Sequence, residues 1–462
     1  MTLRSRVFEG IGVLASTVGV WLSFGQASGD AIVAEENTQG GQAEPKYLGA
    51  ESCAGCHAMK EPAATKRQSS DKTEYHKWNG SDRHSKAYSV LKEKKTADIA
   101  RRLKLKTLPK DWENPEQPPK EWEQCLNCHS MNLIPQPLRG QSFKLSDGVS
   151  CDGCHGPAEL WLGPHLEREY PVSLKLGMKD IRDPLVRAET CVSCHAGNRA
   201  EGKIVDHELL AAGHPPLVFE LDAYSQRMPP HWRDKPPQPQ SENLPRARVW
   251  AVGQLVTARE AARLVAADAG SDRWPEYSHF DCSACHHDLE AGWRQQRPDP
   301  TPLGRPAWQM GDRTVILGQL VGDSRSLLDS LGLVSRAMAS RPFGDARQAA
   351  GAAATLAELL DEAAKAVASQ SLPPERVREL ALRVSESANA VAWRGPQPAL
   401  QLAYALQALI AQLATDGAAP ARRQIASVIK GLEDGSHYEP GDFIEKIVAV
   451  RHQLADGRTP RP

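Results

Sequence analysis

Apolar residues recur at the spacing of an α-helix through the last third of the chain, between residues 309 and 457. Prolines and glycines stand where such helices would begin or end, at Pro373-Pro374, Gly395-Pro396 and Gly417. We therefore predict that residues 309–457 form an all-α bundle of five or six helices with a packing or docking role. The apolar faces behind this prediction are Leu327, Leu331, Val334 and Met338; Val377, Leu380, Val384, Ala388 and Val391; and Leu402, Leu406, Leu409 and Leu413.

The part of the chain before this bundle, residues 46–300, shows much less periodicity. Helical spacing is present over Ser85–Leu103 and Arg246–Ala269, whereas strand signals are weak throughout. A cluster of helix breakers, RPDPTPLGRP at Arg297–Pro306, separates this part from the bundle. The predicted fold class is therefore mainly α with long loops, in two domains.

The N-terminus has the features of an export signal over residues 1–28. Arg4 and Arg6 precede an apolar run, Ile11–Phe24, and small residues follow it. This run is short for a membrane span, which needs about 20 residues, so we favour cleavage over an uncleaved N-terminal anchor. Residues 29–45 are polar and small and are expected to form a disordered leader. We expect a periplasmic protein with no other membrane span.

Composition narrows the class of protein. The 462 residues include 56 Lys and Arg against 57 Asp and Glu, with a pI near 6.9, so the chain lacks the basic character of nucleic-acid binders. Hydrophobic residues make up only 40% of the chain. Either the core is thin, or a group that is not amino acid helps to fill it.

The ten cysteines form five pairs, and each pair has two residues between its members and a histidine directly after it. No cysteine is left over. The pairs and their histidines are Cys53, Cys56 and His57; Cys125, Cys128 and His129; Cys151, Cys154 and His155; Cys191, Cys194 and His195; and Cys282, Cys285 and His286.

This C-x-x-C-H pattern is the attachment signature of haem c. The two thiols bond the porphyrin, and the adjacent histidine ligates the iron from one side. Zinc ribbons use C-x-x-C pairs two at a time and give no reason for the histidine. A thioredoxin-like dithiol expects one such pair near a βαβ pattern, and disulfide frameworks belong to short secreted chains. Residues 46–300 are therefore predicted to be a multihaem domain packed around five covalent haems.

Several stretches resemble the cytochrome c-554 family of multihaem cytochromes. They are CAGCH, WNGSDRHSKA, CLNCH, GVSCDGCHGPAELWLGPH and CVSCH, within residues 46–200. The resemblance implies that His84 ligates the iron held by His155, and that His165 ligates the iron held by His57. It also implies that the iron of His129 has an open position. The chain departs from the family in its fifth motif and its helical tail.

The remaining distal ligands are predicted from the residues themselves. A second histidine closes an iron, and His207 and His214 are the best candidates for the irons of His195 and His286, although the sequence leaves their pairing open. His231 and His279 are alternatives. His287 is expected to be crowded by its own motif, and the tail histidines His437 and His452 are expected at the surface.

The predicted function is electron transfer through the five haems between redox partner proteins. The first alternative is a redox enzyme that acts on a small nitrogen or sulfur compound at an open iron of His129. The second is a sensor or scaffold that uses the tail to recruit a partner. Lys86, Lys92, Lys94 and Lys95 are expected either to offset haem propionates or to form a solvated face.

Overall fold

The computed structural model describes residues 44–59, 72–167, 170–231, 245–286, 305–321, 324–413, 418–434 and 438–456. The chain divides into two compact units, residues 1–44 and residues 45–462, and every described helix belongs to the second. The predicted signal peptide, nearly all of the leader, His287 and His437 lie outside the described residues. Among the residues that are described, none of the helices combines the length and apolar character needed to cross a membrane.

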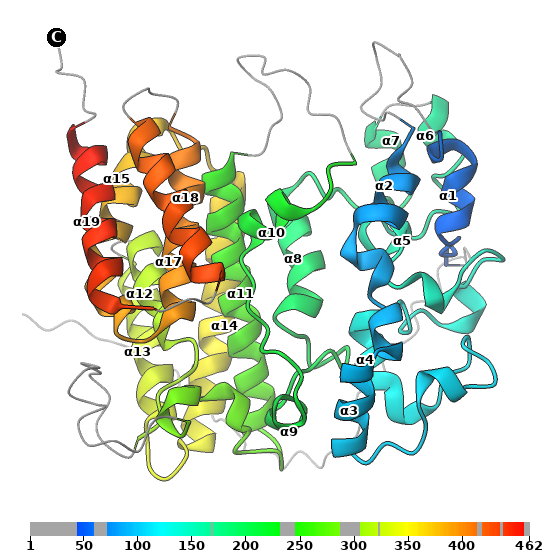
Figure 1. Cartoon of the computed structure of the whole chain (residues 1–462), viewed down its shortest axis with the longest axis horizontal. Coiled ribbons are helices and arrows are strands. Elements are labelled where there is room, and N and C mark those ends of the chain that lie inside the picture. Colours follow the sequence, from blue (N-terminus) through cyan, green and yellow to red (C-terminus); the bar gives the residue numbers. More distant parts are fainter. Residues whose placement is uncertain are drawn as a thin grey trace, which may run out of the picture. The chain divides into compact units, whose positions relative to one another are not determined.

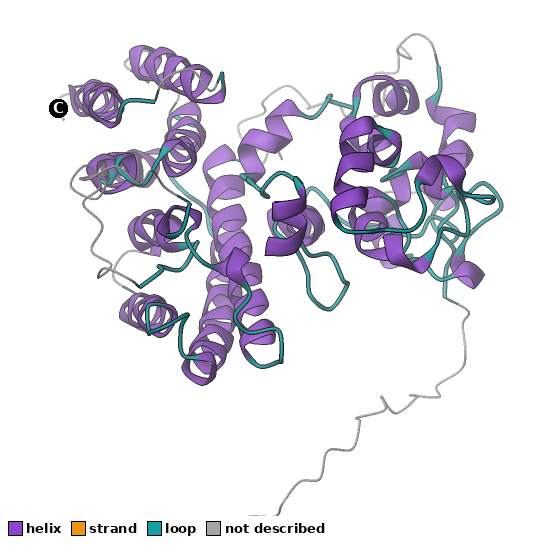
Figure 2. Ribbon diagram, turned by 60° about the horizontal axis from the view of Figure 1, so that its bottom comes forward, coloured by secondary structure: helices purple, strands orange, loops and turns teal. Residues whose placement is uncertain are grey.

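The prediction of a mainly α fold is confirmed (Figures 1 and 2). The described residues pair as strands only in three isolated bridges, such as that between Tyr47 and Arg139. The α-helices are α1 Ala50–His57, α2 Glu74–Ser81, α3 Lys94–Arg102, α4 Glu123–His129, α5 Cys151–His155, α6 Pro164–Glu167, α7 Tyr170–Lys175, α8 Pro184–His195, α9 His207–Ala212, α10 Leu221–Arg227, α11 Arg246–Ala269, α12 Gly311–Val321, α13 Arg325–Met338, α14 Ala346–Ser369, α15 Pro374–Glu386, α16 Ala388–Ala392, α17 Pro396–Ala411, α18 Ala419–Glu433 and α19 Pro440–Asp456.

Short 3₁₀-helices connect the N-terminal elements. They are η1 Arg83–Lys86, η2 Ser89–Lys92, η3 Pro109–Asp111, η4 Lys120–Trp122, η5 Gln136–Leu138, η6 Leu145–Asp147, η7 Tyr277–His279 and η8 Cys282–Ala284.

The N-terminal elements are short and joined by long loops (Figure 2). The continuous helix predicted over Ser85–Leu103 is wrong, because the chain forms η1 and η2 and becomes α-helical only in α3. Glu93 takes an extended conformation between η2 and α3, and the Asp82 side chain caps η1 by accepting a hydrogen bond from the His84 N–H. A cap and an extended residue therefore interrupt a segment whose apolar spacing alone favours one helix.

The helix predicted over Arg246–Ala269 is confirmed as α11. It is buried over most of its length, packs along α14, and contacts α8 on another side (Figure 1). Gly253 permits α10 to approach closely, because a Cβ atom there would lie 2.5 Å from the Cβ of Leu221. The long helix α11 thus joins the motif-bearing helix α8 to the C-terminal helices.

The C-terminal bundle contains eight helices within the described residues, α12–α19, rather than five or six. One reason is that the predicted face from Val377 to Val391 is divided between α15 and α16 at Ser387. The residues predicted to form the apolar faces are buried. His452 is exposed, as expected. The domain division between residues 300 and 309 remains a prediction.

Candidate haem-binding sites

Four of the five C-x-x-C-H motifs form the last turn of a helix, at the ends of α1, α4, α5 and α8. The two cysteines are three residues apart and the histidine follows directly, so in a helix all three side chains lie on one face. The fifth motif is less regular: Cys282 begins η8, and the backbone N–H of His286 donates to the Cys282 carbonyl at 2.7 Å. Each motif is therefore shaped by local backbone structure.

Local sequence also fixes where these helices begin and end. The Asp183 carboxylate caps α8 by accepting hydrogen bonds from the N–H groups of Leu185 and Val186. Gly156 ends α5 with a positive φ of 83°, and a Cβ atom there would lie 2.9 Å from the Gly177 carbonyl oxygen. The glycine after CDGCH is therefore required by the backbone at that position.

The ten thiols form no disulfide. Instead, cysteines from different motifs meet, because Cys53 forms a hydrogen bond with Cys151 and Cys128 forms one with Cys194. The hydrogen bond from Cys128 lowers the pKa of Cys194 to about 7. The first motif thus lies beside the third, and the second beside the fourth.

Histidine rings form four pairs whose geometry suits a shared metal ion. Two imidazoles that each bond one metal at about 2 Å have ring centres about 6 Å apart. The observed centroid distances are 6.2 Å for His57 and His165, 6.1 Å for His84 and His195, 6.3 Å for His129 and His214, and 6.3 Å for His207 and His286.

Hydrogen bonds at Nδ1 leave the Nε2 atom of several of these histidines available to a metal. In five of them Nδ1 already has a hydrogen-bond acceptor, which leaves Nε2 as the free metal-binding nitrogen. The acceptors are Glu74 for His57 at 2.8 Å, Asp82 for His84 at 2.9 Å, the Ala87 carbonyl for His129 at 2.9 Å, the Leu162 carbonyl for His165, and the Pro215 carbonyl for His214 at 2.8 Å.

In two other histidines, Nε2 rather than Nδ1 forms the hydrogen bond. His76 engages Nε2 with the Ala58 carbonyl at 2.9 Å, and His279 engages Nε2 with the Asp268 carboxylate at 2.8 Å. Neither presents a free Nε2 to an iron. The structure therefore does not support His279 as an alternative ligand.

The four histidine pairs given above for the described residues include every motif histidine except His155. Burial, followed by the charges of His231, His57 and His165, lowers its pKa to about 4. The Nδ1 atom of His231 lies 3.3 Å from the Pro229 carbonyl oxygen.

Burial lowers the pKa of His129 and lowers that of His195 to about 4, which favours the neutral form that binds iron. The pKa of His84 moves the other way, since its hydrogen bond to Asp82 raises it. A carboxylate behind a ligating imidazole fixes its tautomer and makes it a stronger ligand.

The pairings differ in part from those that the resemblance implied. His165 does lie opposite His57, but the structure places His84 opposite His195 rather than His155. His214 lies opposite His129, whose iron was expected to be open, and His207 lies opposite His286. The physical cause at His214 is the docking of α9 on α3, where the Arg102 guanidinium donates to the Ala212 carbonyl at 2.9 Å.

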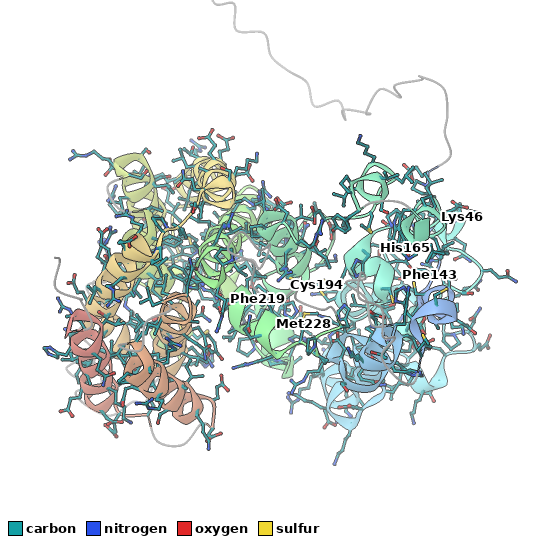
Figure 3. The ribbon with its side chains drawn as sticks, turned by 90° about the horizontal axis from the view of Figure 1, so that it is seen from above. Lys46, Phe143, His165, Cys194, Phe219 and Met228 are labelled. Atoms are coloured by element: carbon teal, nitrogen blue, oxygen red, sulfur yellow. The ribbon has the colours of Figure 1, made fainter. Side chains whose placement is uncertain are left out.

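His195 is surrounded by aromatic residues that the motifs and periodicity did not single out. Phe219 stacks on its ring at a centroid distance of 4.8 Å, and Tyr224 contacts both rings edge-on. Figure 3 labels Phe219 and Cys194, the residue before His195. Arg313, from α12 of the bundle, donates to the Phe219 carbonyl at 2.5 Å. The C-terminal bundle therefore helps to hold a residue that packs against a motif histidine.

A buried carboxylate links the fourth and fifth motifs. Asp268, at the end of α11, is fully buried and pairs with Arg199, Arg273 and His279. Arg199 follows His195 closely in the chain, and His279 closely precedes Cys282. One side chain thus ties both motif segments to α11.

The residues present fit covalent haem better than a bare metal site. Within the described ranges, no group of three or more His, Cys, Asp or Glu side chains is arranged to hold a metal ion directly. The cysteine pairs and the histidine separations instead match a ring that is bonded at its edge and ligated on both faces.

Comparison with known families agrees with this assignment. Residues 52–156, which contain the first three motifs, match the family described as cytochrome c554 and c-prime. This segment, less than a quarter of the chain, is similar to that family. The similarity favours a c-type cytochrome, a class of protein that binds haem c and transfers electrons. No curated protein and no solved structure matches the chain.

The cytochrome c554 match ends at Gly156. The motifs at Cys191 and Cys282, together with the C-terminal bundle, lie beyond it. His84 is inside the matched segment, whereas His165, His207, His214 and His231 are outside it.

Proposed function

We propose that this cytochrome is an exported electron carrier that holds five covalent haems and passes electrons between redox partner proteins. The observation that carries the proposal is the set of four facing histidine pairs, with ring centroids 6.1 to 6.3 Å apart. When bound, haem iron between two imidazoles takes up and releases single electrons and has no position left for substrate.

The residues would divide the work as follows. The ten motif cysteines attach the haems, and the motif histidines His57, His129, His155, His195 and His286 are the proximal ligands. The distal ligands are His165 for the iron of His57, His214 for that of His129, His231 for that of His155, His84 for that of His195 and His207 for that of His286.

The contacts between motifs support a carrier. The hydrogen-bonded thiols bring the first motif to the third and the second to the fourth. The short helix α9 begins with His207 and is followed by His214, so it serves the fifth and second motifs together. Neighbouring redox groups are what electron transfer through one chain requires.

Export follows from the N-terminal signal features and from the chemistry of haem c, whose attachment takes place outside the cytoplasm. We therefore propose a periplasmic location.

The enzymatic alternative needed an open iron at His129. His214 occupies the facing position, and its Nδ1 is already engaged with the Pro215 carbonyl. The geometry therefore favours the carrier over catalysis at this haem.

Electron paramagnetic resonance on histidine variants tests the proposal. We expect His165→Ala and His214→Ala each to convert one low-spin haem to high spin, because each change removes one of two axial imidazoles. His76→Ala is the matched control and should leave the spectrum unchanged, since that ring uses Nε2 elsewhere.

Two outcomes would contradict the proposal. One is a mature protein whose intact mass contains fewer than five haems. The other is steady turnover of nitrite or hydroxylamine by the unaltered protein with a reduced dye, which would place catalysis ahead of electron carriage.

A further inference from the structure

Basic side chains gather on and around α3. Residues 92–106, called here the basic strip, contain seven Lys and Arg residues and only two acidic residues, Glu93 and Asp98. All seven basic residues are exposed. The strip thus has a net charge of +5, while the whole chain has a net charge of −1. The positive field is therefore local to this surface.

Few of these charges are neutralised within the protein. Arg101 pairs with Asp98 at 2.9 Å, and the Lys92 ammonium lies 5.1 Å from the centre of the Tyr88 ring. Within the part of the chain that the structure describes, no other side chain of the basic strip forms an ion pair. Lys94, Lys95, Lys104 and Lys106 therefore present their charges to solvent.

The basic strip lies next to one candidate haem site. Its helix α3 packs on α9, and Arg102 donates to the carbonyl of Ala212, two residues before His214. The basic strip is therefore adjacent to the segment of His214, whose ring faces that of His129.

We propose that the basic strip is the docking surface for the acidic face of a redox partner protein, which exchanges electrons at the site of His129 and His214. This inference rests on the proposed function. Charges at the edge of a transient interface mainly accelerate encounter and orient the partner, and the strip has the local sign contrast that such steering needs.

The composition of the basic strip favours a protein partner over a lipid surface. An interfacial helix inserts large apolar side chains between lipids. In α3 the residue Ala100 is buried, and none of the exposed large apolar residues among the described ones falls within residues 92–106. The basic strip therefore carries positive charge but has no exposed large apolar side chains that could insert between lipids.

The test is the rate at which the haem-loaded protein is reduced by a plant-type ferredoxin, a strongly reducing and acidic iron–sulfur protein. We expect the double variant Lys94→Glu/Lys95→Glu to lower the second-order rate constant at low ionic strength about tenfold. The difference should disappear as salt screens the charges.

Arg423→Glu/Lys430→Glu is the matched control. It makes the same change in net charge at two exposed positions of α18. We expect its rate constant to stay within about twofold of the parent. An equal loss in both double variants would overturn the proposal, because net charge alone would then explain the effect.

Three further measurements separate the remaining explanations. Reduction by a small neutral dye should be unchanged in the Lys94/Lys95 variant. A shifted haem potential with equal slowing by dye and ferredoxin would mean that the strip neutralises propionates, and would overturn the docking proposal. Sedimentation of the parent, but not the variant, with phosphatidylserine vesicles would overturn it in favour of a membrane. Failure of the dye to reduce any haem would instead refute the proposed function.

Discussion

The two halves of this protein are stabilised in different ways. Between Tyr88 and Leu145, the described residues of the N-terminal part form one apolar cluster of eight buried side chains. Around α11 and the bundle, two clusters contain 32 and 26 buried side chains. The first region has short helices and long loops, whereas the second buries long amphipathic helices against one another (Figure 1).

This difference indicates what each region needs in order to fold. A bundle whose helices share a continuous apolar core is stabilised by its own side chains. A loop-rich segment with a small core buries little apolar surface against the conformational entropy that it loses. We infer that the N-terminal region depends on its covalent cofactors and that the bundle does not.

Removal of one haem from the N-terminal region should have the largest effect, because only that region is expected to depend on its cofactors. In Cys125→Ala/Cys128→Ala, α4 loses its attachment beside the buried residues Trp122 and Leu126. We expect the N-terminal region to become sensitive to protease while the bundle stays intact, as measured by intact mass and limited proteolysis.

Cys282→Ala/Cys285→Ala is the control for that experiment. These two cysteines are exposed, and their motif is a single turn, so its loss should leave the first four motifs protected. Cleavage of the bundle as fast as the N-terminal region in the α4 variant would show that the two regions do not differ in this respect.

A core truncation in the bundle should have a smaller effect, and that effect should be confined to the stability of the bundle. Leu402 on α17 is fully buried, so Leu402→Ala should reduce the free energy of unfolding by about 2 to 5 kcal/mol. Haem content should not change. Denaturant unfolding followed by circular dichroism, with haem absorbance in parallel, measures both.

Leu333→Ala is the matched variant, since Leu333 is 51% exposed on α13. It should change stability by less than about 0.5 kcal/mol. Equal effects of the two substitutions would argue against a core built from these apolar faces.

The smallest expected effect is on the pH dependence of stability, through Asp268, which links the two regions. Burial raises the pKa of Asp268, but hydrogen bonds from His279 and Arg199 outweigh burial and hold the pKa at about 2. Because the folded pKa is below the unfolded value of about 3.9, this carboxylate stabilises the fold above pH 4. That contribution, about 2 kcal/mol, should be lost as the pH falls from about 4 to 2.

Asp268→Asn should therefore flatten the acid side of the stability profile. Asp442→Asn, at a residue 59% exposed on α19, should leave the profile unchanged. An acid limb that is the same in both variants would mean that Asp268 does not join the regions as proposed.

The sequence predicted regular helices well and irregular ones poorly. Arg246–Ala269 was predicted with its observed bounds, because a long stretch with uninterrupted apolar spacing leaves few alternatives. Ser85–Leu103 was not, because Asp82 and His84 form local hydrogen bonds and the ring of His84 packs against that of His195. A contact with a residue so distant in the chain leaves no trace in local periodicity.

The sequence by itself determined the five C-x-x-C-H motifs and predicted their role in haem attachment, since two cysteines and a histidine within five residues are brought together by one turn of backbone. It also determined the helical character of the C-terminal bundle. Only the tertiary structure decided which distant histidine faces which motif, as with His84 opposite His195 and His214 opposite His129. The physical reason is that those pairs are set by the packing of α9 on α3 and by side-chain hydrogen bonds at Nδ1, and neither depends on spacing along the chain.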